Sequence, residues 1–109
     1  METHIHQEKG TVIISIKGRM DAMTSLNFER GLSGMIAKGE RSFLINMSQM
    51  EYMSSAGLNV LYKILRQLKS LGGKLRFTGL QDPIRELFEI SGFNALFAIY
   101  ETEEEALRS

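Results

Sequence analysis

Residues 43–73 read FLINMSQMEYMSSAGLNVLYKILRQLKSLGG, and this stretch decides the fold class. Its first five residues are almost all apolar, which is typical of a central strand covered on both faces. Over residues 55–71, leucines recur at helical spacing and form one apolar stripe, while cationic side chains occupy the other side. Gly72 and Gly73 follow as a stop signal. The stretch therefore predicts a buried strand that leads directly into a long amphipathic helix.

Strands and helices alternate on both sides of this stretch. Upstream we predict a strand over 4–8, a turn at Lys9-Gly10, a strand over 11–17, and a helix over 24–38 capped by Thr24 or Ser25. Downstream we predict a strand over 74–78, a helix with Asp82 as N-cap, Pro83 at its first position and Gly92-Phe93 at its end, a strand over 96–100, and a helix over 102–108 capped by Thr102. This order predicts one α/β domain with a mixed, mostly parallel sheet of about five strands and about four helices.

The composition excludes several classes of function. The chain has 109 residues, with 13 Lys and Arg against 13 Asp and Glu, so its net charge of +0 argues against a nucleic-acid binder or a polybasic membrane-surface protein. With 0 Cys there is no disulfide framework and no thiolate site for a metal. No apolar run approaches the roughly 20 residues that span a bilayer, and the N-terminus has no signal-peptide pattern. We therefore expect a cytoplasmic domain without a membrane segment.

The two histidines do not complete a catalytic or metal site. His4 and His6 fall on one face of the first predicted strand, and no third ligand stands near them in the sequence. A serine nucleophile at Ser55 would need a histidine base, which no motif supplies. We therefore expect no enzyme activity, no metal and no cofactor.

Ser54 and Ser55 lie at the start of the long predicted helix, where backbone N–H groups have no partner within the helix. One capping serine explains such a position and contributes about 1 kcal/mol. A helix cap needs only one of the two serines. A phosphate on the other would be stabilised by the helix N-terminus and would add about two negative charges to the surface. The pair is therefore interpreted either as a helix cap or as a site of modification.

Methionines gather around these serines. Met20 and Met23 lie in the predicted loop after the second strand, and Met47, Met50 and Met53 precede the serines. Both loops can lie on the same edge of an α/β sheet, and methionine suits interfaces that repack. Gly57 leaves room for another backbone or a partner to come close. Two interpretations follow, a docking surface and simple core filling.

Residues 63–76 carry only positive charges, whereas the C-terminal segment is acidic. Solvated faces explain both segments, and electrostatic steering of a partner is the alternative. Gly72-Gly73 suggests a phosphate cradle, but no Walker-type Gly-Lys-Ser/Thr follows it, so a helix C-cap is the better interpretation.

Four segments together resemble the STAS domain family, and within it the bacterial anti-sigma factor antagonists. Gly18-Arg19-Met20-Asp21 is similar to the family's Gly-Glu-Leu-Asp strand end, and residues 53–58 (MSSAGL) are similar to its Met-Asp-Ser-Ser/Thr-Gly-Leu loop. Residues 71–75 (LGGKL) resemble its Gly-Gly turn, and residues 85–92 (RELFEISG) its Arg-Leu-Phe helix. The order and spacing of these segments agree with the family over nearly the whole chain.

The resemblance implies regulation by partner switching. The unphosphorylated antagonist binds an anti-sigma factor, which is also its Ser/Thr kinase of the histidine-kinase-like ATPase class, and a Ser phosphatase resets the modified form. Aligned on Met53 and Gly57, Ser55 matches the family's phosphoserine, with Ser54 as the alternative. The expected partner-binding residues share the same loop edge: Met20, Asp21, Met23, Asn46, Met50, Met53, Ser54, Ala56 and Gly57.

The chain departs from the family pattern beside the proposed phosphoserine. Ser54 stands where many members carry Asp, Ala56 where they carry a second Ser or Thr, and Asn59 where they often carry Gly. A second hypothesis therefore stays open, in which the domain is a constitutive scaffold in a signalling complex and the serines only cap a helix. We expect a monomer or a weak dimer through the edge strand.

Overall fold

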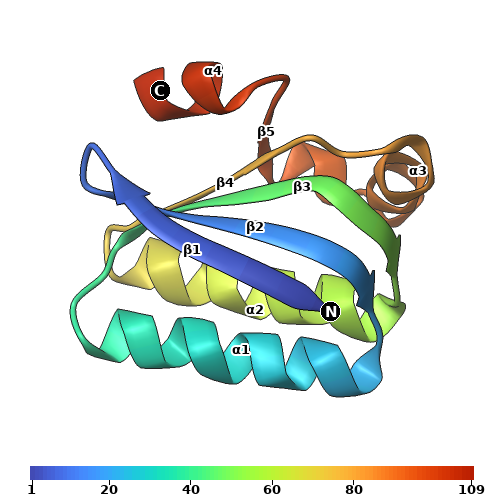
Figure 1. The fold of residues 1–109 in the computed structure, drawn as a ribbon, viewed down its shortest axis with the longest axis horizontal. Helices are drawn as coiled ribbons and strands as arrows, with labels where there is room; N and C mark the ends of the chain where they lie inside the picture. Colours follow the sequence, from blue (N-terminus) through green and yellow to red (C-terminus); the bar gives the residue numbers. More distant parts are fainter.

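The computed structural model describes residues 1–109, and its elements follow the predicted order (Figure 1). The strands and helices are β1 (Glu2–Glu8), β2 (Thr11–Met20), α1 (Ala22–Ala37), β3 (Ser42–Met53), α2 (Ser55–Ser70), β4 (Lys74–Thr78), α3 (Asp82–Ser91), β5 (Ala98–Tyr100) and α4 (Glu103–Arg108). A single 3-10 turn, Phe93–Ala95, lies between α3 and β5. None of the helices combines the length and the apolar character that crossing a membrane requires.

The five strands form one sheet in the order β1-β2-β3-β4-β5. β1 is antiparallel to β2, and the other neighbouring strands are parallel, so the predicted mixed and mostly parallel sheet is confirmed. The hairpin between β1 and β2 turns at Lys9 and Gly10, which both have positive φ angles. Because β2, β3 and β4 run in the same direction, their carboxyl ends meet at one edge of the sheet and their amino ends at the other.

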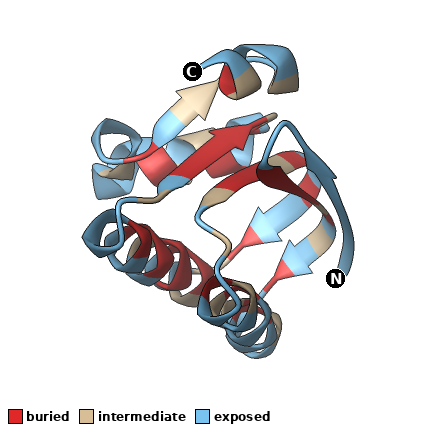
Figure 2. Ribbon diagram, turned by 90° about the vertical axis from the view of Figure 1, so that its left-hand side faces the viewer, coloured by how far each residue is buried: buried red, intermediate tan, exposed pale blue.

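Helices cover the two faces of the sheet unequally. α1 and α2 lie on one face and α4 on the opposite face (Figure 1). The larger core contains 24 buried residues, among them Phe43 and Ile45 of β3 and Leu61 of α2. The face under α4 has only a small cluster of Ile13, Leu44 and Ala106. Figure 2 shows the buried positions of α1 and α2 directed at the sheet, so these two helices provide most of the apolar stabilisation.

Several element boundaries differ from the prediction, and β2 and β3 extend to Met20 and Met53, beyond the predicted ends at 17 and 47. α1 begins at Ala22 and is capped by Asp21, so the expected cap at Thr24 or Ser25 is wrong. The N-cap of α3 is Gln81, which makes no capping bond, while Asp82 and Pro83 are the first two helical residues. β5 begins only at Ala98 and not at 96, because Leu96 is the C-cap of the 3-10 turn and Phe97 enters the core. Sequence patterns locate such boundaries only to within a few residues.

Arg76 of β4 is buried, although the sequence places it in a solvated cationic stretch. Its guanidinium donates to the carbonyl of Ala106 at 2.6 Å and to the hydroxyls of Thr11 and Ser42 at 3.0 and 2.6 Å. β4 alternates as predicted, but α4 covers the face that the alternation leaves polar. Arg76 therefore ties the last helix to the sheet.

Candidate partner-binding site

The carboxyl ends of β2 and β3 lead into helices through single residues. Asp21 alone separates β2 from α1, and Ser54 alone separates β3 from α2. Met20 pairs with Met53 in the sheet, and the amide of Ser54 donates to the carbonyl of Met20 at 2.8 Å. The two junctions are thus hydrogen-bonded to each other, and the expectation that both lie on one edge of the sheet is confirmed.

The structure gives the two serines different environments. Ser54 is half-buried, and its hydroxyl accepts a hydrogen bond from the amide of Gly57 at 3.2 Å, so Ser54 is the N-cap of α2. Ser55 is the first residue of α2 and is exposed, and its hydroxyl makes no hydrogen bond within the chain. The capping role and the accessible hydroxyl therefore belong to different residues.

Asp21 makes a reciprocal cap at the start of α1. Its carboxylate accepts from the amide of Thr24 at 2.9 Å, and its own amide donates to the Thr24 hydroxyl at 2.8 Å. Hydrogen bonds from the Thr24 backbone, and then from its side chain, stabilise the charged form and hold the pKa of Asp21 below its usual value of 3.8. The negative charge also lies at the positive end of the helix dipole.

Most methionines near the serines are in the core. Met20, Met47 and Met50 have no exposed area and Met53 is only 5% exposed, so these side chains cannot contact a partner in this conformation. Met47, Met50 and Met53 are three residues apart, and the register shifts in the pairing of β2 with β3 keep them all in the larger core. For them, core filling is the correct interpretation, and the predicted docking surface loses Met20, Met50 and Met53 as direct contacts. Met23, in α1, is 70% exposed and remains on that surface.

Gly57 makes room for two of these methionines. A Cβ atom on Gly57 would lie 3.0 Å from Cγ and Sδ of Met20 and 3.0 Å from Cγ of Met53. Gly57 itself is buried. The close approach expected at this position is therefore made by the chain's own side chains, and the first turn of α2 packs tightly over the ends of β2 and β3.

The accessible surface around Ser55 combines apolar and cationic groups. The guanidinium carbon of Arg19 lies 4.4 Å from the ring centroid of Tyr52, and Arg19 and Tyr52 are paired across β2 and β3. A groove of about 260 Å³ runs between the first turns of α1 and α2, lined on its two sides by Leu26 and Ala56. Tyr52 and Leu26 are both more than two-fifths exposed. This surface is suited to bind another protein.

Sequence reasoning missed Arg19, Tyr52 and Leu26 as parts of this surface. The register of β2 on β3 brings Arg19 and Tyr52 together, and a single strand does not reveal that register. Leu26 is 43% exposed because Ser25 and Phe28 are the residues of its helix that face the sheet. A correct prediction that α1 begins at Ala22 would have helped to place Leu26.

Asn46 does not share this surface. Its amide nitrogen donates to the carboxylate of Glu103 in α4 at 2.8 Å, and its amide oxygen accepts from the backbone of Ser48. Asn46 therefore lies on the sheet face opposite α1 and α2. The histidines are also remote from any site, since β1 is exposed along its whole length, and no cluster of three or more His, Cys, Asp or Glu is arranged to hold a metal.

A family model for the STAS domain matches residues 2–106. The chain belongs to the STAS domain family. Among curated proteins, the STAS domain is 33% identical over 97 residues to BtrV of Bordetella bronchiseptica, whose name places it among anti-sigma factor antagonists; the match covers 89% of this chain and 84% of BtrV. It is 31% identical over 91 residues to the anti-sigma-B factor antagonist of Staphylococcus aureus, with 84% of each chain covered.

Solved structures share the fold of this STAS domain. An anti-sigma factor antagonist structure from Thermotoga maritima superposes with a TM-score of 0.93 at 19% identity, covering 97% of this chain and 92% of that one. The unphosphorylated form of the anti-sigma factor antagonist SpoIIAA gives a TM-score of 0.78 at 20% identity, covering 98% and 96% of the two chains. These matches establish the fold, and the family membership rests on the sequence.

Proposed function

We propose that this STAS domain is an anti-sigma factor antagonist that binds its anti-sigma factor while Ser55 is unmodified and releases it once Ser55 carries a phosphate. The observation that carries the proposal is the exposed, unbonded hydroxyl of Ser55 beside a cap that Ser54 already provides. The names of relatives at 31–33% identity support the antagonist role. On this proposal the domain is a regulatory binding module and not an enzyme.

The position of Ser55 suits a reversible modification. At the first residue of α2, a phosphate lies beside backbone amides that have no partner in the helix and near the positive end of the dipole. It displaces no hydrogen bond, because the Ser55 hydroxyl makes none. The modified domain therefore keeps its fold, and the change is confined to the surface.

That surface change is large enough to end binding. The groove between α1 and α2 is lined half by apolar residues, the exposed Met23 and Tyr52 add apolar area beside it, and Asp21 and Glu29 already contribute negative charge. Burying a phosphate there without cationic partners costs several kcal/mol, and each ~1.4 kcal/mol weakens binding tenfold. We expect at least a hundredfold difference in affinity between the two forms. Two cations lie nearby: Arg19, whose stacking on Tyr52 keeps it at the edge of the surface, and Lys63, which lines the groove together with Glu29.

The partner is proposed to be an anti-sigma factor with Ser/Thr kinase activity of the histidine-kinase-like ATPase class, and a Ser phosphatase restores the unmodified form. The test uses S55A and S55D proteins as matched baits in lysate of the native cell. An ATPase of that class that is retained by S55A and lost with S55D supports the proposal. Equal retention by both baits contradicts the switch and favours a constitutive scaffold.

The site of modification is tested with the purified partner, ATP and Mg²⁺. Intact-mass measurement is expected to show one phosphate on the wild-type protein and on S54A, and none on S55A. Phosphate on S55A but not on S54A would transfer the proposal to Ser54. Because Ser54 is the cap of α2, the folding of S54A is checked first by circular dichroism.

A further inference from the structure

A second polar region lies at the opposite edge of the sheet from Ser55. A pocket of about 320 Å³ is formed where the β1–β2 turn, the start of β3 and the α2–β4 turn meet. Four cationic side chains line it: Lys9, Arg41, Lys74 and Arg76. Hydroxyl groups of Thr11, Ser42 and Ser109 complete its polar wall. No acidic side chain lines the pocket, and the one carboxylate there is the terminal one of Ser109, which forms no ion pair with the four cations.

Arg76 forms the floor of this pocket and is not fully satisfied. The residue is only 4% exposed, and its two terminal nitrogens donate to one carbonyl and three hydroxyls at 2.6–3.3 Å. Its Nε atom is buried and has no hydrogen-bond partner, the one such side-chain atom in the molecule. Burial lowers the pKa of the guanidinium from its usual value, because the charged form loses its hydration. Burying a charge without an ionic partner is costly.

Arg41 is also held in place. Its guanidinium donates to the carbonyls of Ile36 and Glu40 at 2.8 and 2.9 Å, at the end of α1. Its own carbonyl accepts from the amide of Lys74 at 2.7 Å, and a Cβ atom on Gly73 would lie 2.5 Å from that carbonyl oxygen. Gly73 thus lets the α2–β4 turn lie directly against the start of β3, which brings Arg41 and Lys74 to the same pocket.

None of these four cations has a carboxylate partner. The one ion pair in the molecule joins Arg108 and Glu104 on the surface of α4. The carboxylates of Glu8, Glu103 and Glu104 line a separate, smaller pocket that shares only Lys9 and Leu107 with the cationic one. Carbonyl groups at the ends of α1 and α4 offset part of the charge of Arg41 and Arg76, and Lys9 also lines the pocket that holds the three glutamates, whereas Lys74 has no such neighbour. The pocket is therefore electropositive in a protein whose net charge is zero.

From this arrangement we infer that the pocket binds a multivalent phosphate group, such as the diphosphate of a small phosphorylated molecule. The guanidinium of Arg41 and the two flexible ammonium groups suit a ligand with several anionic oxygens, while the buried Arg76 adds positive charge beneath them. The pocket volume lies near the lower end of the ~300–1,000 Å³ found for small-molecule sites.

Recognition here depends on side chains and not on a glycine loop. The amides of Gly72, Gly73 and Lys74 donate to the carbonyls of Lys69, Leu68 and Arg41, so none is free to hold a phosphate. This finding agrees with the helix-end interpretation of the two glycines. The cationic side chains, which the sequence shows only as part of a positive stretch, supply the binding groups instead.

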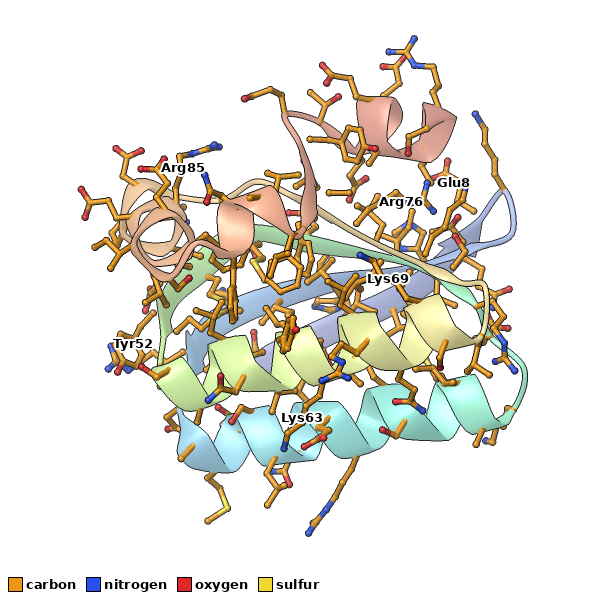
Figure 3. The ribbon with its side chains drawn as sticks, turned by 180° about the vertical axis from the view of Figure 1, so that it is seen from behind. Glu8, Tyr52, Lys63, Lys69, Arg76 and Arg85 are labelled. Atoms are coloured by element: carbon orange, nitrogen blue, oxygen red, sulfur yellow. The ribbon has the colours of Figure 1, made fainter.

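The pocket is well separated from the proposed phosphorylation site. Ser55 begins α2 and Gly72-Gly73 follow its end, and a helix of 16 residues is about 24 Å long. Figure 3 shows Arg76 and Tyr52 at opposite ends of the molecule. A ligand in this pocket therefore does not compete with a protein bound around Ser55.

The test is a titration of the ¹⁵N-labelled protein with pyrophosphate, followed by NMR at constant ionic strength maintained with sodium chloride. We expect saturable shifts of the Arg76 Nε–H signal and of the amides of Gly10 and Lys74. The K74Q variant is expected to weaken binding about two- to fivefold, the range for one exposed charge. K63Q removes an equally exposed charge from the middle of α2 and is expected to leave the affinity unchanged.

Three results would overturn the inference. The first is a shift that grows linearly with pyrophosphate, or that chloride alone reproduces. The second is an equal loss of affinity in K74Q and K63Q, which would show general attraction to positive charge. The third is saturable binding whose shifts lie around Ser55 and leave the Arg76 signal unmoved. Neither lysine variant alters a buried residue, so loss of folding does not obscure the comparison.

Discussion

The amide of Ser54 donates to the carbonyl of Met20 at 2.8 Å, which bonds the residue that caps α2 to the last residue of β2. The start of α2 is thereby fixed to the strand that leads into α1. Because both helices begin within two residues of this bond, the surface between them has a defined shape before any partner arrives. A binding surface that is ordered in advance loses little conformational entropy on association.

The two serines are expected to differ in their effect on stability. S54A removes the hydroxyl that accepts from the Gly57 amide and is expected to lower the free energy of unfolding by about 1 kcal/mol. S55A removes a hydroxyl without a bond and is expected to change it by less than about 0.5 kcal/mol. Urea unfolding followed by circular dichroism measures both. Equal losses in the two variants would contradict the assignment of the cap to Ser54.

Two glycine substitutions are expected to change the stability of the fold in opposite directions. G73A places a Cβ atom 2.5 Å from the carbonyl oxygen of Arg41, so the α2–β4 turn must move and stability falls by about 1–3 kcal/mol. G34A, in the exposed face of α1, meets no atom within 4 Å and raises stability by up to about 1 kcal/mol through helix propensity. Thermal unfolding of the two variants beside wild type gives the comparison. A stabilising G73A would show that the turn is more adaptable than its contacts indicate.

Asp21 is expected to make the stability of the fold depend on pH in the acidic range. Its pKa is lower in the folded state than its usual value of 3.8, so near that pH the unfolded chain binds more protons than the folded one. The stabilising contribution is complete above pH 3.8 and is lost as the pH falls through the lower folded value. NMR titration of the Asp21 carboxyl carbon gives the folded pKa directly. D21N keeps a capping oxygen without the titration, and a variant with the same acid dependence as wild type would contradict this role.

Removal of the Arg76 guanidinium is expected to release α4. R76M fills a similar volume but removes the donor that joins the Ala106 carbonyl to the hydroxyls of Thr11 and Ser42, which keep only their bonds to Ser109 and to each other. We expect a loss of about 1–3 kcal/mol. Hydrogen exchange is expected to accelerate in α4 and in β5 and to change little in α2. Uniform acceleration throughout the domain would show that Arg76 supports the main core as well.

The order of elements could be predicted because each has a strong local signal. The leucine stripe of α2, the apolar run in β3 and the positive-φ glycine after α3 all act within a few residues of their own position. The cap at Thr102 was predicted for the same reason, whereas the sequence left open which of Ser54 and Ser55 caps α2. The start of α1 was missed because Thr24 and Ser25 are ordinary capping residues, while Asp21 three residues earlier completes a reciprocal pair with Thr24.

The candidate surface was predicted only in part, since exposure depends on which elements cover which face. Met20 and Met53 were assigned to a docking surface from their position near Ser55, but the register of β2 on β3 turns both inward. Arg76 shows the reverse case, because a short helix distant in sequence covers a position that alternation leaves polar. The local sequence pattern predicts where a strand ends. Whether the side chains at that end are buried depends on how the helices and the sheet pack against each other.

The single-residue junctions at Asp21 and Ser54 also limit how this chain can vary in length. Inserting one residue between Met53 and Ser55 would turn α2 by about 100° relative to β3, since a helix has 3.6 residues per turn. Leu58 and Leu61 would leave the sheet, and Ser55 would no longer stand at the helix start. Insertions and deletions are therefore expected to accumulate in the turns at the amino edge of the sheet, while the spacing between Met53 and Ser55 stays constant among functional variants.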